Sequence, residues 1–446
     1  SKYAKASYSL TNNPDALRLY RDMAKKTGDK TVQYTYAKYL LEIAALYDQG
    51  RETKHNKLSS FKHSFGEASQ RLRHELNQVS KHTLDHSKHK TTPFSNPQHP
   101  PENNSHRRKK RALEEEGIRW MKRLAKEHMP DAAFTVATWM DECMYGFTRN
   151  PAKSFLLYDI AAKAGIREAI YKIGLYYESI DDHANALHCI KKASELGVVH
   201  ATLKLAKIYL HGELSQRQNM TLAISLLHDA TNDADESCPE PPYMFGLILT
   251  NTYPKAEIPR QVVEQYGGVL ASLPYFEKAV HLGYPPAHSA LGNILEHGLY
   301  GLGVNYAQCY IHYTEAAKRE DAQGMLGLSR LNNRGSHGPT DDKDLQQKRI
   351  FSDESGWLAQ REPNEESAFY WCQKAADLEL SEAEFLLGWY YEIGLGTPRD
   401  LEKAQWYYHK AAMKGNEEAY QRLDQDSSQT PTNITLKKES QQCIVM

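Results

Sequence analysis

Small and large apolar residues follow a regular pattern along most of the chain, and residues 383–419 carry its clearest copy. The first part of this copy spaces apolar residues as a helix with one narrow side, which a neighbour can approach closely: Ala383, Leu387, Gly388 and Tyr391. Two glycines then interrupt the helix. Asp400 can cap a second helix, and Gly415 supplies the left-handed residue that ends it. The pattern therefore predicts one helical hairpin.

The same signals return with a period of roughly 36 residues, which is typical of repeat proteins. The leading alanine of the first helix recurs, with Pro241 in the equivalent place of one further copy: Ala132, Ala169, Ala201, Ala287, Ala322, Ala383 and Ala419. A second small residue follows five positions later: Ala137, Gly174, Ala206, Gly246, Gly292, Gly327 and Gly388. A hairpin of this size cannot bury both of its faces alone, so the copies must stack. We predict an all-α fold, an α/α solenoid of helical hairpins.

These residues resemble the Sel-one-like repeat, a relative of the tetratricopeptide repeat, over most of residues 112–420. The motif is specific because two small residues, an aromatic residue and two glycines recur in register. Glu320 and Glu379 stand where a glycine should close the second helix. A residue other than glycine costs on the order of 1 kcal/mol at that position. We therefore expect these two turns to be built differently from the others.

The same pattern divides the chain into four segments. Residues 15–26 look like a second helix, and residues 32–47 look like a first helix whose partner resumes near Ala112. The predicted segments are N-terminal helices that begin the first repeat (1–50), a disordered basic, His-rich insert (51–110), the repeat solenoid (111–424) and a flexible tail (425–446).

Charge is distributed unevenly between the insert and the repeats. Residues 51–111 contain fourteen Lys or Arg and five Asp or Glu, whereas the whole chain has a net charge of −1. A basic segment attached to an acidic body suggests an interaction arm or self-association. The run from Arg107 to Arg111 fits either a nuclear signal or a hinge that touches anionic lipid. Within the insert, apolar residues between 61 and 79 could form one short amphipathic helix.

Two further inserts interrupt later repeats, near residues 251–268 and 336–364. Each falls at the turn between the two helices of a hairpin. Insertions at the same point of a repeat emerge on the same edge of a solenoid, so that edge is a candidate contact surface.

The residue types that carry enzyme chemistry do not form a recognisable motif. The chain contains no phosphate-binding glycine loop and no nucleophile elbow, and its six cysteines are scattered singly. The His281/His288 and His86/His89 pairs are interpreted as solvated or core residues rather than metal ligands. No secretory signal and no long apolar run is present, which favours a reducing cytosol. We expect no enzyme activity, cofactor, metal, small-molecule substrate or nucleic-acid binding.

The last four residues, Cys443 to Met446, read CIVM and fit a farnesylation signal. The transferase needs an accessible tail thiol, aliphatic residues before the end and a terminal residue that selects the isoprenoid. We therefore predict a farnesyl group on Cys443. One prenyl chain gives only marginal membrane binding, so a second contact is required. The basic insert or a membrane-embedded partner could provide it.

The repeats, the phrases LRLYRDMAKKTGDKTVQYTYAKYL and ALEEEGIRWMKRLAKE, and the C-terminal box together resemble the fungal chitin synthase activator family. This resemblance implies a non-catalytic adaptor, tethered to the cytoplasmic face of the plasma membrane. It would activate or localise the catalytic chitin synthase during septum and cell-wall synthesis. A septin-associated scaffold is a further implied partner.

Other functions remain open at this stage. The leading alternative is a general repeat scaffold that binds peptides for another membrane or cell-division complex. An adaptor of endoplasmic-reticulum quality control would need a signal peptide and a membrane span. A hydrolase on this repeat scaffold would need paired cysteines in each repeat.

The register of the repeat also predicts where a partner binds. In tetratricopeptide-like hairpins the first helix lines the concave face, so positions three and seven, counted from the repeat alanine, should face a groove. Those positions hold Phe134, Thr138, Tyr171, Leu175, Leu203, Lys207, Tyr243, Leu247, Ser289, Asn293, Phe385 and Trp389. Exposed aromatic residues of this kind form interaction hot spots. The alternative is that Phe385 and Trp389 pack only against the neighbouring repeat.

Overall fold

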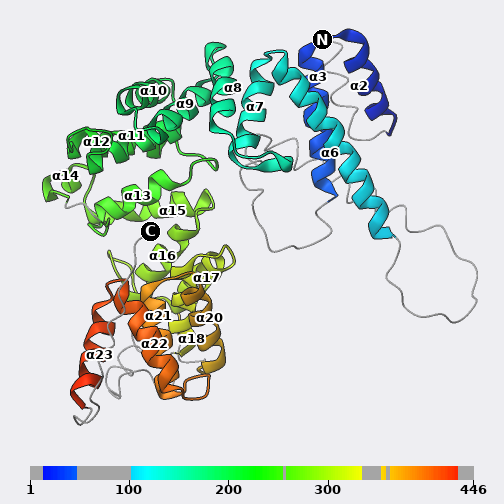
Figure 1. The fold of residues 1–446 in the computed structure, drawn as a ribbon. Helices are drawn as coiled ribbons and strands as arrows, with labels where there is room; N and C mark the ends of the chain where they lie inside the picture. The colour runs from blue at the N-terminus through cyan, green and yellow to red at the C-terminus, as the bar shows by residue number, and fades with distance from the viewer. Residues whose placement is uncertain (1–13, 48–101, 255–257, 334–352, 358–361, 430–446) are drawn as a thin grey trace, which may run out of the picture. The chain divides into compact units, whose positions relative to one another are not determined.

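A computed structural model describes residues 14–47, 102–254, 258–333, 353–357 and 362–429 (Figure 1). Nearly all of these residues lie in helices or in the short turns that join them. The described part contains no β-strand, only an isolated bridge between Val304 and Asp353. The chain divides into two compact units, residues 1–238 and 239–446, which we call unit 1 and unit 2. The all-α prediction is confirmed.

Unit 1 is a row of helices in which each packs against the next along the chain. It consists of α2 (Pro14–Thr27), α3 (Lys30–Leu46), α6 (Glu102–Lys126), α7 (Pro130–Asp141), the 3-10 turn η2 (Met144–Gly146), α8 (Pro151–Lys163), α9 (Arg167–Ser179), α10 (His183–Glu195), α11 (Val199–His211) and α12 (Met220–Asn232). Helix α3 pairs with α6, although more than fifty residues separate them in sequence (Figure 1). The array therefore begins near the start of the chain, as predicted.

Unit 2 repeats the same arrangement of first and second helices. It consists of α13 (Glu240–Leu249), α14 (Arg260–Gln265), the 3-10 turn η3 (Val269–Ala271), α15 (Ser272–His281), α16 (Pro285–His297), α17 (Tyr306–Ala317), α18 (Ala322–Asn333), α20 (Glu365–Asp377), α21 (Ser381–Ile393), α22 (Leu401–Met413) and α23 (Glu417–Gln429). The hairpins pair α13 with α15, α16 with α17, α18 with α20 and α21 with α22.

Side-chain caps set where the second helices begin. In each of six of them, an Asn or Asp accepts a hydrogen bond from the backbone N–H three residues later: Asn150, Asp182, Asn219, Asn305, Asn364 and Asp400. This bond satisfies one of the N–H groups that the first helical turn leaves without a partner. Past the other end of α22, Gly415 adopts a φ of 87°, as the sequence predicts for a residue that stops a helix.

The expectation that Glu320 and Glu379 build different turns is wrong. Both residues adopt the left-handed conformation, with φ of 61° and 63°. The N–H of Glu320 donates to the carbonyl of Ala317, and the next N–H donates to that of Ala316; the same pattern closes the hairpin at Gly415. Stacking of the repeats fixes the turn, and the glutamates accept a strain of about 1 kcal/mol.

The small residues of the first helices are the points where the second helices come closest. A Cβ added to Gly388 would lie 2.8 Å from the ring of Tyr408, and one added to Gly246 would lie 2.7 Å from Phe276. Tyr313 is held from two sides, because an added Cβ at Gly292 or at Gly327 would approach its ring to 2.6 or 2.4 Å. Each glycine therefore makes room for an aromatic side chain of the facing helix.

Two predicted boundaries differ from the structure. Residues 102–110 were expected in the disordered insert, but they form the first turns of α6. Residues 425–429 were expected in the flexible tail, but they belong to α23. The insert near 251–268 contains the short helix α14. Residues 48–101, including the possible amphipathic helix, and the tail from 430 onward lie outside the described residues.

Candidate partner-binding groove

Four of the residues predicted to face a partner meet in one cleft of unit 2, which we call the central groove. Tyr243 and Leu247 come from α13, and Ser289 and Asn293 come from α16. The next first helix, α18, adds Gln323 and Arg330 to the lining. The groove has a volume of about 300 Å³. Residues from three consecutive first helices thus line one cleft, although Gln323 and Arg330 of α18 do not stand at the two positions counted in the sequence.

The apolar part of the groove is built around Tyr243, which is half-buried. Its ring lies 6.0 Å from Phe276 and 5.2 Å from Tyr284, measured between ring centroids. Burial, with help from the nearby carboxylates of Asp321 and Glu240, raises the pKa of Tyr243 to about 12. The hydroxyl is therefore neutral at physiological pH. Additional apolar lining comes from Pro286, Ala290, Ile294, Leu299 and Tyr300.

The polar part of the groove consists of groups that hold one another in place. Nη2 of Arg330 donates to the buried carboxylate of Glu296 at 3.0 Å, and the Tyr313 hydroxyl donates to the same carboxylate at 2.6 Å. The hydroxyl of Ser289 donates to Asp321, which also accepts from the backbone N–H at the start of α18. These contacts fix the wall before any partner arrives.

An apolar cleft with fixed polar groups at its edge suits a peptide segment. Its volume accommodates one or two side chains, and Asn293 is exposed on its rim. Across the described ranges, no group of three or more His, Cys, Asp or Glu is placed to hold a metal ion.

The other predicted groove residues do not line the central groove. Phe134 packs 5.7 Å from Tyr158, and Phe385 packs 5.6 Å from Tyr408, between ring centroids. Trp389 packs against the same core cluster as Phe385. Phe385 thus packs against the second helix of its own hairpin, and both Phe385 and Trp389 remain partly exposed, so their part in partner binding stays a prediction.

The remaining predicted groove residues, all in unit 1, differ from one another in how far they are exposed. Tyr171 lies against His200, with ring centroids 6.3 Å apart. Leu203 is buried, whereas Thr138, Leu175 and Lys207 are half-buried. Their part in partner binding stays a prediction.

Exposed apolar residues that were not predicted from the sequence recur on the second helices. Ile311, Tyr370 and Trp406 are 53%, 50% and 56% exposed. Each lies six positions after the capping residue of its helix, on α17, α20 and α22. A count from the caps would have found them, because equal spacing places these residues on equivalent faces of successive repeats.

Cys443 lies outside the described residues, so the predicted farnesyl site has no structural description. Within the ranges that are described, no helix is long and apolar enough to cross a membrane.

Comparison with known proteins identifies the repeat. The Sel1 repeat family matches residues 130–166, 167–198, 199–232, 285–321, 356–380 and 381–416. Five of these six segments each contain one complete hairpin, and the segment 356–380 contains α20. The Sel-one-like resemblance is therefore confirmed.

Two curated fungal proteins are similar to this chain. Chitin synthase regulatory factor 3 of Schizosaccharomyces pombe is 29% identical over 327 residues, covering 71% of this chain and 32% of its own length. Chitin synthase regulator SKT5 of Saccharomyces cerevisiae is 25% identical over 421 residues, covering 93% of this chain and 50% of its own length. The chain thus spans about a third to a half of the length of these relatives.

Among solved structures, a Sel1 repeat protein from Oxalobacter formigenes is 20% identical, with 86% of this chain and 99% of that chain covered and a TM-score of 0.45. The repeat matches and the named fungal relatives agree with the resemblance found in the sequence. This chain carries Sel1 repeats and is similar to fungal proteins named as chitin synthase regulators.

Proposed function

We propose that this chain is a non-catalytic adaptor that regulates a chitin synthase, by activating the enzyme or by localising it. The similarity to two proteins named as chitin synthase regulators, one of which aligns with 93% of this chain, carries the proposal. A stacked-hairpin array supports it physically, since such arrays offer long concave surfaces for partner segments.

The central groove is the proposed contact for the synthase. Tyr243 and Leu247 offer an apolar surface for one or two anchor side chains, and the fixed polar groups near Arg330 can pair with the backbone or a polar residue of the bound segment. The occupant would be a cytosolic segment of the enzyme. Such a contact needs no catalytic group on the adaptor.

The proposal includes a farnesyl anchor on Cys443 and a location on the cytoplasmic face of the plasma membrane, at the division septum. The CIVM ending supports the anchor. Because one prenyl chain binds membranes weakly, binding to the synthase would supply the second contact. A septin-associated scaffold is a further proposed partner that would confine the complex to the septum.

Affinity purification from fungal membranes tests the partner. The wild-type chain should recover a catalytic chitin synthase, and the Tyr243→Ala variant should recover much less of it at the same expression level. Recovery of other cell-division proteins without any synthase would contradict the proposal and favour a general repeat scaffold.

Cell fractionation tests the anchor separately. In cells lacking the synthase, Cys443→Ser should move most of the protein from the membrane fraction to the soluble fraction. Cys372→Ser is a matched change at a buried cysteine outside the box, and it should leave the distribution unchanged. Equal fractionation of wild type and Cys443→Ser would disprove the lipid anchor.

A further inference from the structure

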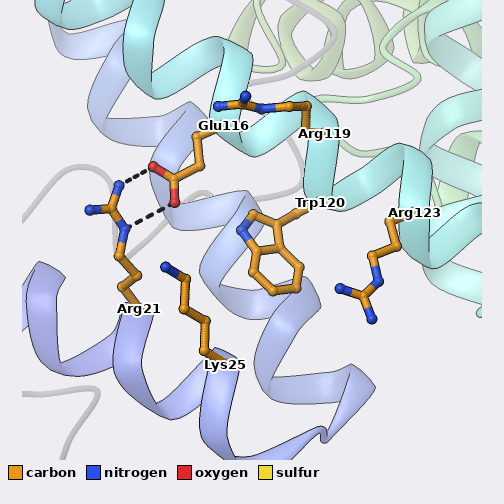
Figure 2. Close-up of a pocket in the computed structure, with 6 residues that line it drawn as sticks. All are labelled: Arg21, Lys25, Glu116, Arg119, Trp120 and Arg123. Atoms are coloured by element: carbon orange, nitrogen blue, oxygen red, sulfur yellow. Dashed lines mark hydrogen bonds and ion pairs between the residues drawn. The ribbon is translucent and has the colours of Figure 1, made fainter.

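Unit 1 contains a recess between α2 and α6 that the proposed function does not use. It has a volume of about 490 Å³, and Figure 2 shows six side chains from the two helices around it: Arg21, Lys25, Glu116, Arg119, Trp120 and Arg123. Four of these side chains are cationic and only one is acidic. We call this recess the cationic pocket.

The single carboxylate in the pocket is already engaged. Glu116 accepts a hydrogen bond from Nε of Arg21 at 3.0 Å and another from the hydroxyl of Tyr36 at 3.0 Å. Burial alone would raise the pKa of Glu116, but the hydrogen bonds from Arg21 and Tyr36 lower it. Glu116 is therefore ionised, and its charge is used to position Arg21.

Of the ion pairs in the described part of the chain, none joins the other three cations to a residue that lines the pocket. Lys25 and Arg119 are exposed and form no ion pair within the described part of the chain. Arg123 pairs at 2.9 Å with Glu127, which does not line the pocket. Three positive side chains thus surround one recess without a matching negative charge in it.

Helix α6, which forms one wall of the pocket, adds to the positive electrostatic potential around it. Helix α6 carries nine Lys or Arg and four Glu. Arg107, Arg108 and Lys109 at its start are exposed, as are Lys122 and Lys126 near its end. Like charges gathered along one helix attract anions over distances of about one Debye length, near 10 Å.

The shape and side chains of the pocket favour clustered phosphate groups. Arginine presents a planar fork of donors that matches two phosphate oxygens, and lysine adds a compact point charge. Arg123 lies over the indole of Trp120, 5.7 Å from the ring, and Tyr36 meets the indole edge-on. These contacts occupy the indole, so stacking of a nucleobase is disfavoured and recognition falls to the cations.

We propose that the cationic pocket binds a cyclic polyol that carries two or more phosphate monoesters, either as a membrane-lipid headgroup or as a free soluble compound. This proposed ligand binding is independent of the proposed regulation of a chitin synthase. If the source is a lipid, unit 1 contacts the membrane through a site separate from the tail.

Binding of two probes to the full-length chain, produced without a prenyl group, tests the proposal. The first probe is soluble inositol trisphosphate, and the second is a vesicle that contains phosphatidylinositol bisphosphate. Vesicles of equal surface charge made with phosphatidylserine measure general attraction. Binding of inositol trisphosphate supports the pocket, and so does stronger binding to the bisphosphate vesicles than to the phosphatidylserine vesicles. The probe that binds identifies the source of the ligand.

Variants locate the binding. Lys25→Gln combined with Arg119→Gln should weaken binding by about tenfold or more, because two charged contacts are lost from the recess. Arg108→Gln combined with Lys126→Gln removes the same charge from α6 outside the pocket and should weaken binding less than about twofold. All four side chains are exposed, so the fold should persist, which circular dichroism checks. Equal losses in the two variants would overturn the proposal, and so would no binding of inositol trisphosphate together with equal binding to the bisphosphate and phosphatidylserine vesicles.

Discussion

Replacing Glu296 tests what holds the wall of the central groove. The side chain is fully buried, and its carboxylate accepts from the Tyr313 hydroxyl at 2.6 Å and from Nη2 of Arg330 at 3.0 Å. Burial and the Glu296 carboxylate raise the pKa of Tyr313, so the hydroxyl keeps its proton and remains a donor. Glu296→Gln preserves the shape of the side chain but removes the charge that both donors face.

The size of the effect follows from the exposure of the two partners. Removing one partner of a fully buried ion pair costs roughly 3 to 5 kcal/mol, whereas an exposed pair contributes about 0 to 1 kcal/mol. The side chain of Glu296 is 0% exposed and that of Arg330 is 31% exposed, so this pair lies between the limits. The glutamine can still accept from Tyr313. We expect a loss of about 2 kcal/mol, or roughly 30-fold in the opening equilibrium.

Hydrogen exchange followed by mass spectrometry is the appropriate assay, because repeat arrays can open locally without unfolding throughout. Exchange in peptides from α16 and α18 should accelerate in Glu296→Gln, while peptides from α9 and α10 serve as an internal reference. Glu264→Gln, an exposed change on α14 with the same loss of charge, should leave α16 and α18 unchanged. A decrease of less than about 0.5 kcal/mol in the opening free energy of α16 and α18 would show that the Glu296 pair contributes no more than an exposed ion pair.

Three further changes test the packing of unit 2. Glu320→Gly should stabilise the protein by about 1 kcal/mol in urea unfolding, because a φ of 61° strains a side chain; a loss of stability would show that the glutamate makes a compensating contact. Gly292→Ala should destabilise it by about 1 to 2 kcal/mol, since the new Cβ would lie 2.6 Å from Tyr313 and crowding outweighs the gain in helix propensity; an unchanged melting temperature would contradict this. Burial and the adjacent His312 lower the pKa of His288 to about 4, below its unfolded value near 6.5. The unfolded state therefore binds more protons than the folded state between these two pH values, and the free energy of unfolding should fall as pH decreases from about 6.5 to about 4. His288→Gln should reduce this dependence of stability on pH. Identical dependence in wild type and variant would rule out His288 as its cause.

Local signals explain why so much of the fold could be predicted. The capping residue Asp400 and the closing glycine Gly415 act within a few residues of their positions in sequence, and both behave in the structure as predicted. The small residues also report on packing, because Gly388 is needed wherever a facing ring such as Tyr408 approaches closely. Because each signal recurs in every repeat, the positions of the helices within the repeat can be read from several copies at once.

Two features of the fold were predicted wrongly from the sequence. The polar composition of residues 102–110 suggested disorder, but they continue a helix in which Lys110 and Arg111 pair with glutamates four residues later. At Glu320, the sequence indicated strain correctly but not that the turn would keep its geometry. At residues 102–110 ion pairs between successive turns favour the helix, and a count of polar residues does not include them, whereas at Glu320 the stacked repeats fix the turn.

The candidate site shows the same division. Counting from the repeat alanine placed Tyr243, Leu247, Ser289 and Asn293 on one surface, and they do line one groove. The count could not tell that Phe385 would instead pack against Tyr408, because that depends on which side chain the facing helix presents.

The most direct test of the central claim measures activation of a chitin synthase when the central groove is blocked. Asn293 is exposed on the rim of the groove, so Asn293→Lys adds bulk and charge there without disturbing the core. Gln308→Lys makes a similar change at an exposed position of α17 outside the groove. Each purified protein would be added to fungal membranes that contain the synthase but lack its own regulator. Wild type and Gln308→Lys should raise synthase activity and bind the enzyme, whereas Asn293→Lys should bind about tenfold more weakly or worse. Equal activation and binding by Asn293→Lys and wild type would contradict this prediction.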